Sequence, residues 1–175
     1  TTLALAEQFV ELTRAETQPE LAQDEFDLVA VALNAAEQVW DQARSKNIVV
    51  VQALGDEEAW MRGDPSLIER ALVNLLSNAV KYSPRGAKVR LEISRRNGTW
   101  RCCVIDNGRG IAADQLPHLF ERFTRVPDSD HPREPGTGLG LAFVKVVANR
   151  HGGSIEVQSD VGAGSTFCLQ LPAEQ

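Results

Sequence analysis

The stretch GTGLGLAFVK at residues 136–145 places glycine at every second position directly before a run with helical periodicity. The first amide groups of a helix have no partner within the helix, and the helix dipole adds partial positive charge at that end. Gly136, Gly138 and Gly140 keep side chains away from these amides. The stretch therefore predicts a helix N-terminus that is open to an anion such as a phosphate, with a flexible turn as the simpler alternative.

This glycine spacing differs from two common phosphate-binding patterns. It is not G-x-G-x-x-G, no strand is predicted before it, and G-x-x-x-x-G-K-[ST] occurs nowhere in the chain. A phosphate at this helix would therefore depend on backbone amides and on a lysine from another element. Lys81, near the end of a second predicted helix, is the candidate.

Apolar periodicity and turn residues divide the chain into helices and strands. Helical spacing predicts helices over 3–17, 27–46, 64–82 and 138–151, and short strands are predicted over 47–54 and 58–63. Hairpins are predicted over 87–106, with Asn97-Gly98 at the turn, and over 154–172. The proline-containing segment 17–25 is predicted to be a linker. Helices mixed with mostly antiparallel strands indicate a two-layer α/β (α+β) sandwich.

The composition fits one folded domain. The chain has 175 residues, of which 43% are hydrophobic and 24% charged, and no run approaches the roughly 20 apolar residues of a membrane span. A net charge of −6 argues against nonspecific nucleic-acid binding. Cys102, Cys103 and Cys168 have no CxxC spacing, so we expect buried, reduced thiols in a reducing compartment.

Two segments outside the glycine-rich stretch carry polar groups that suit a nucleotide. On helix 64–82, Asn74, Asn78 and Lys81 share one face, where they offer amide oxygens to a hard cation and a charge to a phosphate. In DNGRGI (106–111), Asp106 follows a buried strand and can accept from an exocyclic amine, with glycines beside it. Taken singly, the helix segment is better explained as a solvated face and the loop segment as an ordinary turn.

Residues 112–136 are irregular, contain prolines at 117, 127, 132 and 135, and are too long for an ordinary connection. This segment is therefore either a functional lid or disordered.

Four segments, in order along the chain, resemble the N, G1, F and G2 boxes of the sensor histidine kinase ATP-binding domain. They are NLLSNAVKYS (74–83), DNGRGI (106–111), LFERFTRV (119–126) and GTGLGLAFVK (136–145). The resemblance extends over about residues 21–172. The kinase domain that this chain resembles belongs to an ATP-binding superfamily shared with gyrase, a mismatch-repair ATPase and a heat-shock chaperone.

The resemblance implies a mixed, mostly antiparallel sheet covered by three helices on one face, with a mobile ATP lid. It implies ATP and Mg²⁺ as cofactors, with Asn78 as the metal ligand and Asn74 contributing beside it. Arg122 and Arg125 are placed to reach the phosphates, and Phe120 and Phe123 would anchor the lid. The other residues that the resemblance assigns to the nucleotide are Lys81, Tyr82, Asp106, Gly108, Gly110, Ile111, Thr137, Gly138, Leu139, Gly140 and Leu141.

Such a kinase transfers the γ-phosphoryl group of ATP to a histidine, which an acidic residue usually follows on a dimerising helix. His118, His131 and His151 lie in other contexts, and we expect surface or packing roles for them. Residues 1–20 resemble the tail of the second dimerisation helix and a linker, and residues 21–175 the catalytic domain. The resemblance thus implies an upstream phosphoacceptor domain of the same or a sister chain, a homodimeric and commonly membrane-anchored parent, a cytoplasmic catalytic domain and a response regulator as partner.

Two other classes of protein remain open. A gyrase-like ATPase carries a glutamate four residues before the first asparagine of the N box, whereas this chain has Arg70 there, beside Glu69. A serine kinase of the anti-sigma type belongs to the same superfamily. These two enzymes form the first class. The second class is a nucleotide-binding interaction module without catalysis, although all four boxes look intact.

Overall fold

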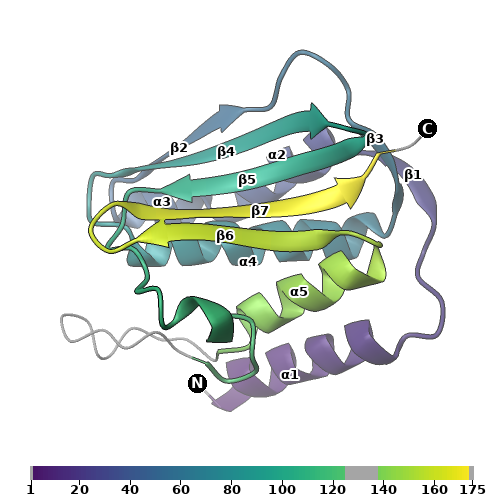
Figure 1. Cartoon of the computed structure of the whole chain (residues 1–175), viewed down its shortest axis with the longest axis horizontal. Helices are drawn as coiled ribbons and strands as arrows, with labels where there is room; N and C mark the ends of the chain where they lie inside the picture. The colour runs from purple at the N-terminus through teal and green to yellow at the C-terminus, as the bar shows by residue number, and fades with distance from the viewer. Residues whose placement is uncertain (1, 125–137, 174–175) are drawn as a thin grey trace.

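The computed structural model describes residues 2–124 and 138–173 and consists of a sheet with helices against one of its faces (Figure 1). The five-stranded sheet has the order β2-β4-β5-β7-β6, in which β2 and β4 run parallel and the other neighbours antiparallel. The predicted two-layer fold is confirmed. The sheet strands are β2 (Val49–Ala53), β4 (Lys88–Arg96), β5 (Thr99–Asp106), β6 (Ser154–Asp160) and β7 (Gly164–Pro172).

The helices α2 (Leu28–Gln38), α4 (Pro65–Tyr82) and α5 (Gly140–Arg150) cover the sheet. Helix α1 (Thr2–Thr17) packs on α5, on the side away from the sheet, through the buried side chains of Leu12 and Ala15. None of the helices in the described part of the chain is long and apolar enough to cross a membrane.

Local sequence signals account for α4, which carries one wall of the site. The Asp64 carboxylate accepts a hydrogen bond from the Leu67 amide at 3.1 Å, and Pro65 occupies the first turn, where its missing N–H costs nothing. The buried stripe of α4 recurs every three or four residues and faces the sheet. Its members are Ile68, Ala71, Leu72, Leu75, Leu76, Ala79 and Val80. This burial orients the opposite, polar face of α4.

Two predicted segments differ in the structure. The helix predicted over 27–46 breaks at Val39 into α2 and a short α3 (Trp40–Ser45). The predicted linker 17–25 contains the start of β1 (Asp24–Asp27), which pairs with β3 (Trp60–Gly63) in a second, two-stranded sheet. The Asp27 carboxylate fixes this corner, because it accepts from the amides of Val29 and Ala59 at 3.0 and 2.9 Å.

The expectation of three reduced thiols is wrong for Cys103 and Cys168, which form a disulfide. Strands β5 and β7 are neighbours, and their register sets these residues opposite each other with Cα atoms 4.1 Å apart. The pairing joins segments separated by 65 residues, so local sequence does not reveal it. Cys102 is the neighbour on the core face, as alternation along a strand predicts, and burial raises the pKa of its thiol to about 12.

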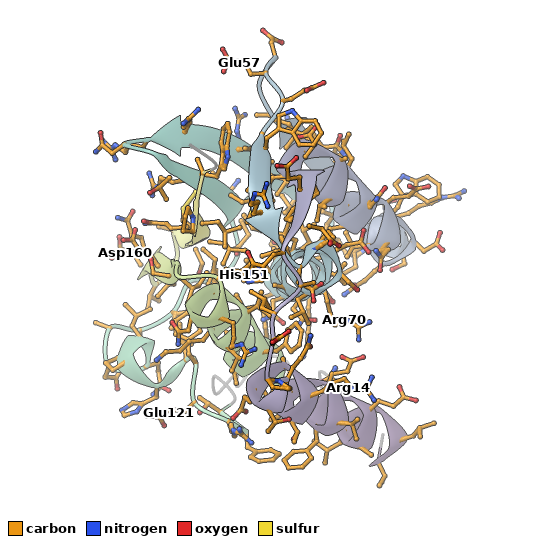
Figure 2. The ribbon with its side chains drawn as sticks, turned by 90° about the vertical axis from the view of Figure 1, so that its right-hand side faces the viewer. Arg14, Glu57, Arg70, Glu121, His151 and Asp160 are labelled. Atoms are coloured by element: carbon orange, nitrogen blue, oxygen red, sulfur yellow. A yellow bond between two sulfur atoms is a disulfide. The ribbon has the colours of Figure 1, made fainter. Side chains whose placement is uncertain are left out.

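His151 has the packing role that we expected. Its Nε2 accepts from the Asp64 amide at 2.9 Å, and its Nδ1 donates to the Val147 carbonyl at 2.8 Å, so the neutral ring joins the end of α5 to the start of α4 (Figure 2). Burial lowers the pKa of His151, and Arg150 acts in the same direction. The Val147 bond and the Asp64 carboxylate oppose the shift.

Acidification is therefore expected to destabilise the fold through His151. Since its pKa is lower in the folded than in the unfolded state, the unfolded chain takes up the proton first, and stability falls as the pH drops below about 6.5. Urea unfolding at pH 7.5 and pH 5.5 should show this loss, and His151→Gln should reduce it. His118→Gln is the matched control, since His118 is exposed, and it should leave the loss of stability between the two pH values unchanged. If His151→Gln also leaves this loss unchanged, His151 is not its cause.

Candidate functional site

A pocket opens between the polar face of α4, the start of α5, the loop after β5 and the segment 119–124. It brings together many of the residues assigned from sequence: Asn74, Asn78, Lys81, Tyr82, Asp106, Gly110, Ile111, Gly138, Gly140 and Leu141. Residues from three separated segments of the chain thus face one cavity.

The α4 side of the pocket presents amide groups and a lysine. The Nδ2 group of Asn74 donates to the Gly140 carbonyl at 3.3 Å, which leaves the Oδ1 atom of Asn74 available as an acceptor. Asn78 lies one turn further along the same face. Neutral oxygens of this kind suit a Mg²⁺ ion that takes most of its other ligands from phosphates and water. The two asparagines therefore fit the predicted cation.

An aromatic ring forms the far end of this wall. The Nζ atom of Lys81 lies 5.1 Å from the centroid of the Tyr82 ring, and the guanidinium carbon of Arg109 lies 4.6 Å from it. Both cations are within the range of cation–π attraction, which holds the ring beside the pocket. The site therefore concentrates positive charge in a protein of net charge −6.

Asp106 is the buried acid of the site. Its carboxylate accepts from the Gly108 amide at 2.8 Å and also from the backbone of Ser165. Burial raises the pKa of Asp106, and these two hydrogen bonds oppose the shift. A carboxylate held by backbone donors on one side presents its remaining lone pairs to the pocket.

Glycines let the loop after β5 pack against backbone. A Cβ atom on Gly110 would lie 2.0 Å from the Asp160 carbonyl oxygen, and one on Gly108 would lie 2.6 Å from that of Tyr82. Gly110 also has a φ of +74°, which side-chain-bearing residues rarely adopt. Close packing against backbone thus requires glycine at both positions, and the positive φ requires it at Gly110 as well.

Gly110→Ala should therefore destabilise the protein far more than Gly86→Ala. Gly86 has a φ of +79°, but a Cβ atom there would meet nothing within 4 Å, so this variant isolates the conformational cost of about 1 kcal/mol. Overpacking against backbone should add about 1–3 kcal/mol at Gly110. Urea unfolding of both variants measures the difference, and equal losses would show that the close approach to Asp160 costs nothing.

The start of α5 is exposed to the pocket as the glycine spacing predicted. The helix follows Leu139, a buried residue whose side chain has no hydrogen-bonding atom to cap it. Gly138 has a φ of +75°, and a Cβ atom there would lie 2.5 Å from the Phe123 carbonyl carbon. The Phe123 amide donates to the Gly138 carbonyl at 2.8 Å, so a backbone contact joins a residue within the predicted lid to the glycine just after it.

Several predicted residues lie outside the pocket lining. Phe120 packs edge-on against Phe167, with ring centroids 6.4 Å apart. The Phe123 side chain is exposed, and the contact that Phe123 makes with Gly138 is through the backbone. Arg122 pairs with Glu16 of α1. The Gly108 backbone amide donates to Asp106, and Leu139 is the buried residue before α5. Arg125 and Thr137 lie outside the described residues, as do residues 125–136 of the predicted lid.

Other residues of the site were missed in the sequence. Besides Arg109, the lining includes Gln8 of α1, Leu119, Thr124, Ser165 and Phe167. Ser165 is the partner of Asp106 in the register of β5 and β7. The predicted hairpin over 154–172 carried no local signal that its second strand would lie beside β5. Arg109, by contrast, stands within the quoted loop and could have been found.

Arg70, at the position where a gyrase-like ATPase has its glutamate, and its neighbour Glu69 make contacts away from the pocket. Arg70 forms an ion pair with Glu11 of α1, between the two helices (Figure 2). The Glu69 carboxylate accepts from the Gln38 side chain of α2 at 3.1 Å. Neither residue lines the pocket.

Known proteins are similar to this chain in both sequence and fold. A family profile described as histidine kinase-, DNA gyrase B- and HSP90-like ATPase matches residues 63–175. The sensor-like histidine kinase SenX3 of Mycolicibacterium smegmatis is 47% identical over 110 residues, which are 63% of this chain and 29% of SenX3. The sensor protein SphS of Synechococcus elongatus is 34% identical over 179 residues, with 97% of this chain and 43% of SphS covered. The chain thus spans less than half the length of these curated relatives.

Solved structures agree. Full-length ShkA in complex with AMPPNP superimposes with a TM-score of 0.86 at 27% identity, over 99% of this chain and 36% of ShkA. The mycobacterial sensor histidine kinase MprB superimposes with a TM-score of 0.76 at 30% identity, over 87% of this chain and 99% of that one. With the fold, the pocket and the matched profile in agreement, the chain belongs to the family of histidine kinase-, DNA gyrase B- and HSP90-like ATPases.

Proposed function

We propose that this chain is the ATP-binding catalytic part of a sensor histidine kinase, which transfers the γ-phosphoryl group of ATP to a histidine on an upstream domain. The observation that carries the proposal is one pocket lined by Asp106, the Asn78–Lys81 face of α4 and the start of α5. These groups suit an adenine, a metal-bound triphosphate and its phosphate oxygens, respectively. The names of the relatives support the same activity.

Within this proposal, Asp106 accepts from the adenine amino group and the start of α5 donates to the phosphates. Asn78, with Asn74 beside it, would hold Mg²⁺, which neutralises charge on the phosphates when bound. Lys81 and the lid arginines Arg122 and Arg125 supply further positive charge. Phosphoryl transfer depends on positioning and charge neutralisation, and this chain offers groups for both.

The division of the chain follows from the same proposal. Residues 1–20 would be the tail of a dimerisation helix and a linker, and residues 21–175 the catalytic domain. The helix α1 at Thr2–Thr17 supports this division. We further propose a homodimeric parent that passes the phosphoryl group to a response regulator, with the catalytic domain on the cytoplasmic side.

The test combines nucleotide binding with the chemistry of the product. Calorimetry of this chain with an ATP analogue, with and without Mg²⁺, should show Mg²⁺-dependent binding. The natural protein that contains this chain should then, with γ-labelled ATP, acquire a phosphoryl label that is stable in alkali and lost in acid. An acid-stable label would indicate a serine kinase, rapid release of phosphate an ATPase, and no Mg²⁺-dependent binding an interaction module.

A further inference from the structure

Strand β6 contributes one polar side chain to the inner face of the sheet beside the pocket. The Ser159 hydroxyl oxygen accepts from the Ile111 amide at 2.7 Å, donates to the Gly164 carbonyl at 2.9 Å and lies 2.7 Å from the Ser165 hydroxyl oxygen. We propose that Ser159 is a positioning residue that fixes Ser165 as a hydrogen-bond acceptor beside Asp106 and thereby favours a 6-amino purine over a 6-oxo purine. The inference rests on the proposed nucleotide-binding function.

Donor counting determines the direction of these bonds. A serine hydroxyl has one hydrogen to donate and two lone pairs to accept with. The Gly164 carbonyl can only accept, so the hydrogen of Ser159 is used there, and the Ile111 amide can only donate, so it takes one lone pair. The remaining contact therefore requires Ser165 to donate to Ser159. With its hydrogen committed, the Ser165 oxygen can only accept from the pocket.

This second acceptor lies next to the first. Asp106 and Ser165 are direct partners in the register of β5 and β7, both line the pocket, and the Ser165 backbone donates to the Asp106 carboxylate. Both residues are buried, at 7% exposure each, so water does not easily replace a missing partner. The base end of the pocket thus offers two adjacent acceptors from these residues.

Two adjacent acceptors distinguish purines by the group at the 6-position. A 6-amino group carries two hydrogens to donate, directly or through a bound water, whereas a 6-oxo group carries lone pairs alone. A buried acceptor that faces another acceptor loses its hydrogen bond and gains repulsion. Sites that pair their polar groups with a substrate discriminate strongly against analogues that leave them unpaired. Without Ser159, the Ser165 hydroxyl could rotate and donate to a 6-oxo group.

The test is the ratio of the dissociation constants for IDP and ADP, measured by calorimetry on this chain with Mg²⁺. These ligands differ at the purine 6-position and in the hydrogen on N1. Ser159→Ala should lower the IDP-to-ADP ratio at least fivefold. Ser159→Thr keeps the hydroxyl and should preserve the ratio. Ser154→Ala, at the exposed beginning of the same strand, is the matched control and should leave both constants unchanged.

A purely structural role for Ser159, through the Ile111 amide, would weaken IDP and ADP alike and leave their ratio constant, which would overturn the inference. Ser165→Ala provides an independent check should Ser159→Ala fail to fold, since it removes the second acceptor and should also lower the ratio. An unchanged ratio there overturns the inference as well. Failure of the unaltered chain to bind ADP would instead refute the proposed function.

Discussion

Asp106→Asn is expected to weaken binding of an ATP analogue about 100-fold while leaving the free energy of unfolding nearly unchanged. The amide replaces an acceptor with a donor that faces the adenine amino group, and loss of a charge-assisted hydrogen bond costs about 3 kcal/mol. Folding is less affected, because the carboxylate is itself disfavoured by burial and the Asn oxygen can still accept from Gly108. Calorimetry and urea unfolding measure the two quantities.

Asp160→Asn is the matched control for this substitution. Asp160 also ends a strand, but its side chain is exposed and it lies outside the pocket lining. We expect unchanged affinity and stability in this variant. Normal analogue binding by Asp106→Asn would remove the acid from the adenine-binding role, whereas an unfolded variant would show that Asp106 mainly supports the fold.

Asn78→Ala is expected to abolish most of the gain in nucleotide affinity that Mg²⁺ provides and to slow phosphoryl transfer by about 100-fold, because a displaced metal misaligns the transferred group. Affinity for ADP without Mg²⁺ should change little, since the base and the start of α5 are untouched. Titrations with and without Mg²⁺ separate the two effects, and transfer is measured in the natural protein that contains this chain.

Asn34→Ala gives the appropriate control, because Asn34 is an exposed asparagine on α2, away from the pocket. It should retain the full Mg²⁺ dependence. If Asn78→Ala also retains it, the metal is held elsewhere, and Asn74, whose Nδ2 is already committed to Gly140, becomes the residue to substitute next.

The parts of the fold that were predictable depend on short-range chemistry. Asp64 and Pro65 mark the start of α4 within two residues, and Asn97-Gly98 turns the hairpin with φ angles of 52° and 74°. The strand β1 and the Cys103–Cys168 disulfide were not predictable, because both arise from the register between segments far apart in the chain. No window of local sequence contains that information.

The same distinction applies to the site. Asn74, Asn78 and Asp106 could be identified because helical spacing and a strand end display them locally, in motifs of fixed order. Ser165 and Gln8 enter the pocket through tertiary packing, from the last strand and from α1. The ion pair between Arg122 and Glu16 likewise depends on where α1 lies. The role proposed for Arg122 at the phosphates stays a prediction.

The insertion of β7 between β5 and β6 has a consequence for biosynthesis. This strand follows β6 in the chain yet fills an interior place in the sheet, and it carries Ser165 and Phe167 into the pocket. A nascent chain still attached to the ribosome therefore lacks a completed cavity until β7 has cleared the exit tunnel.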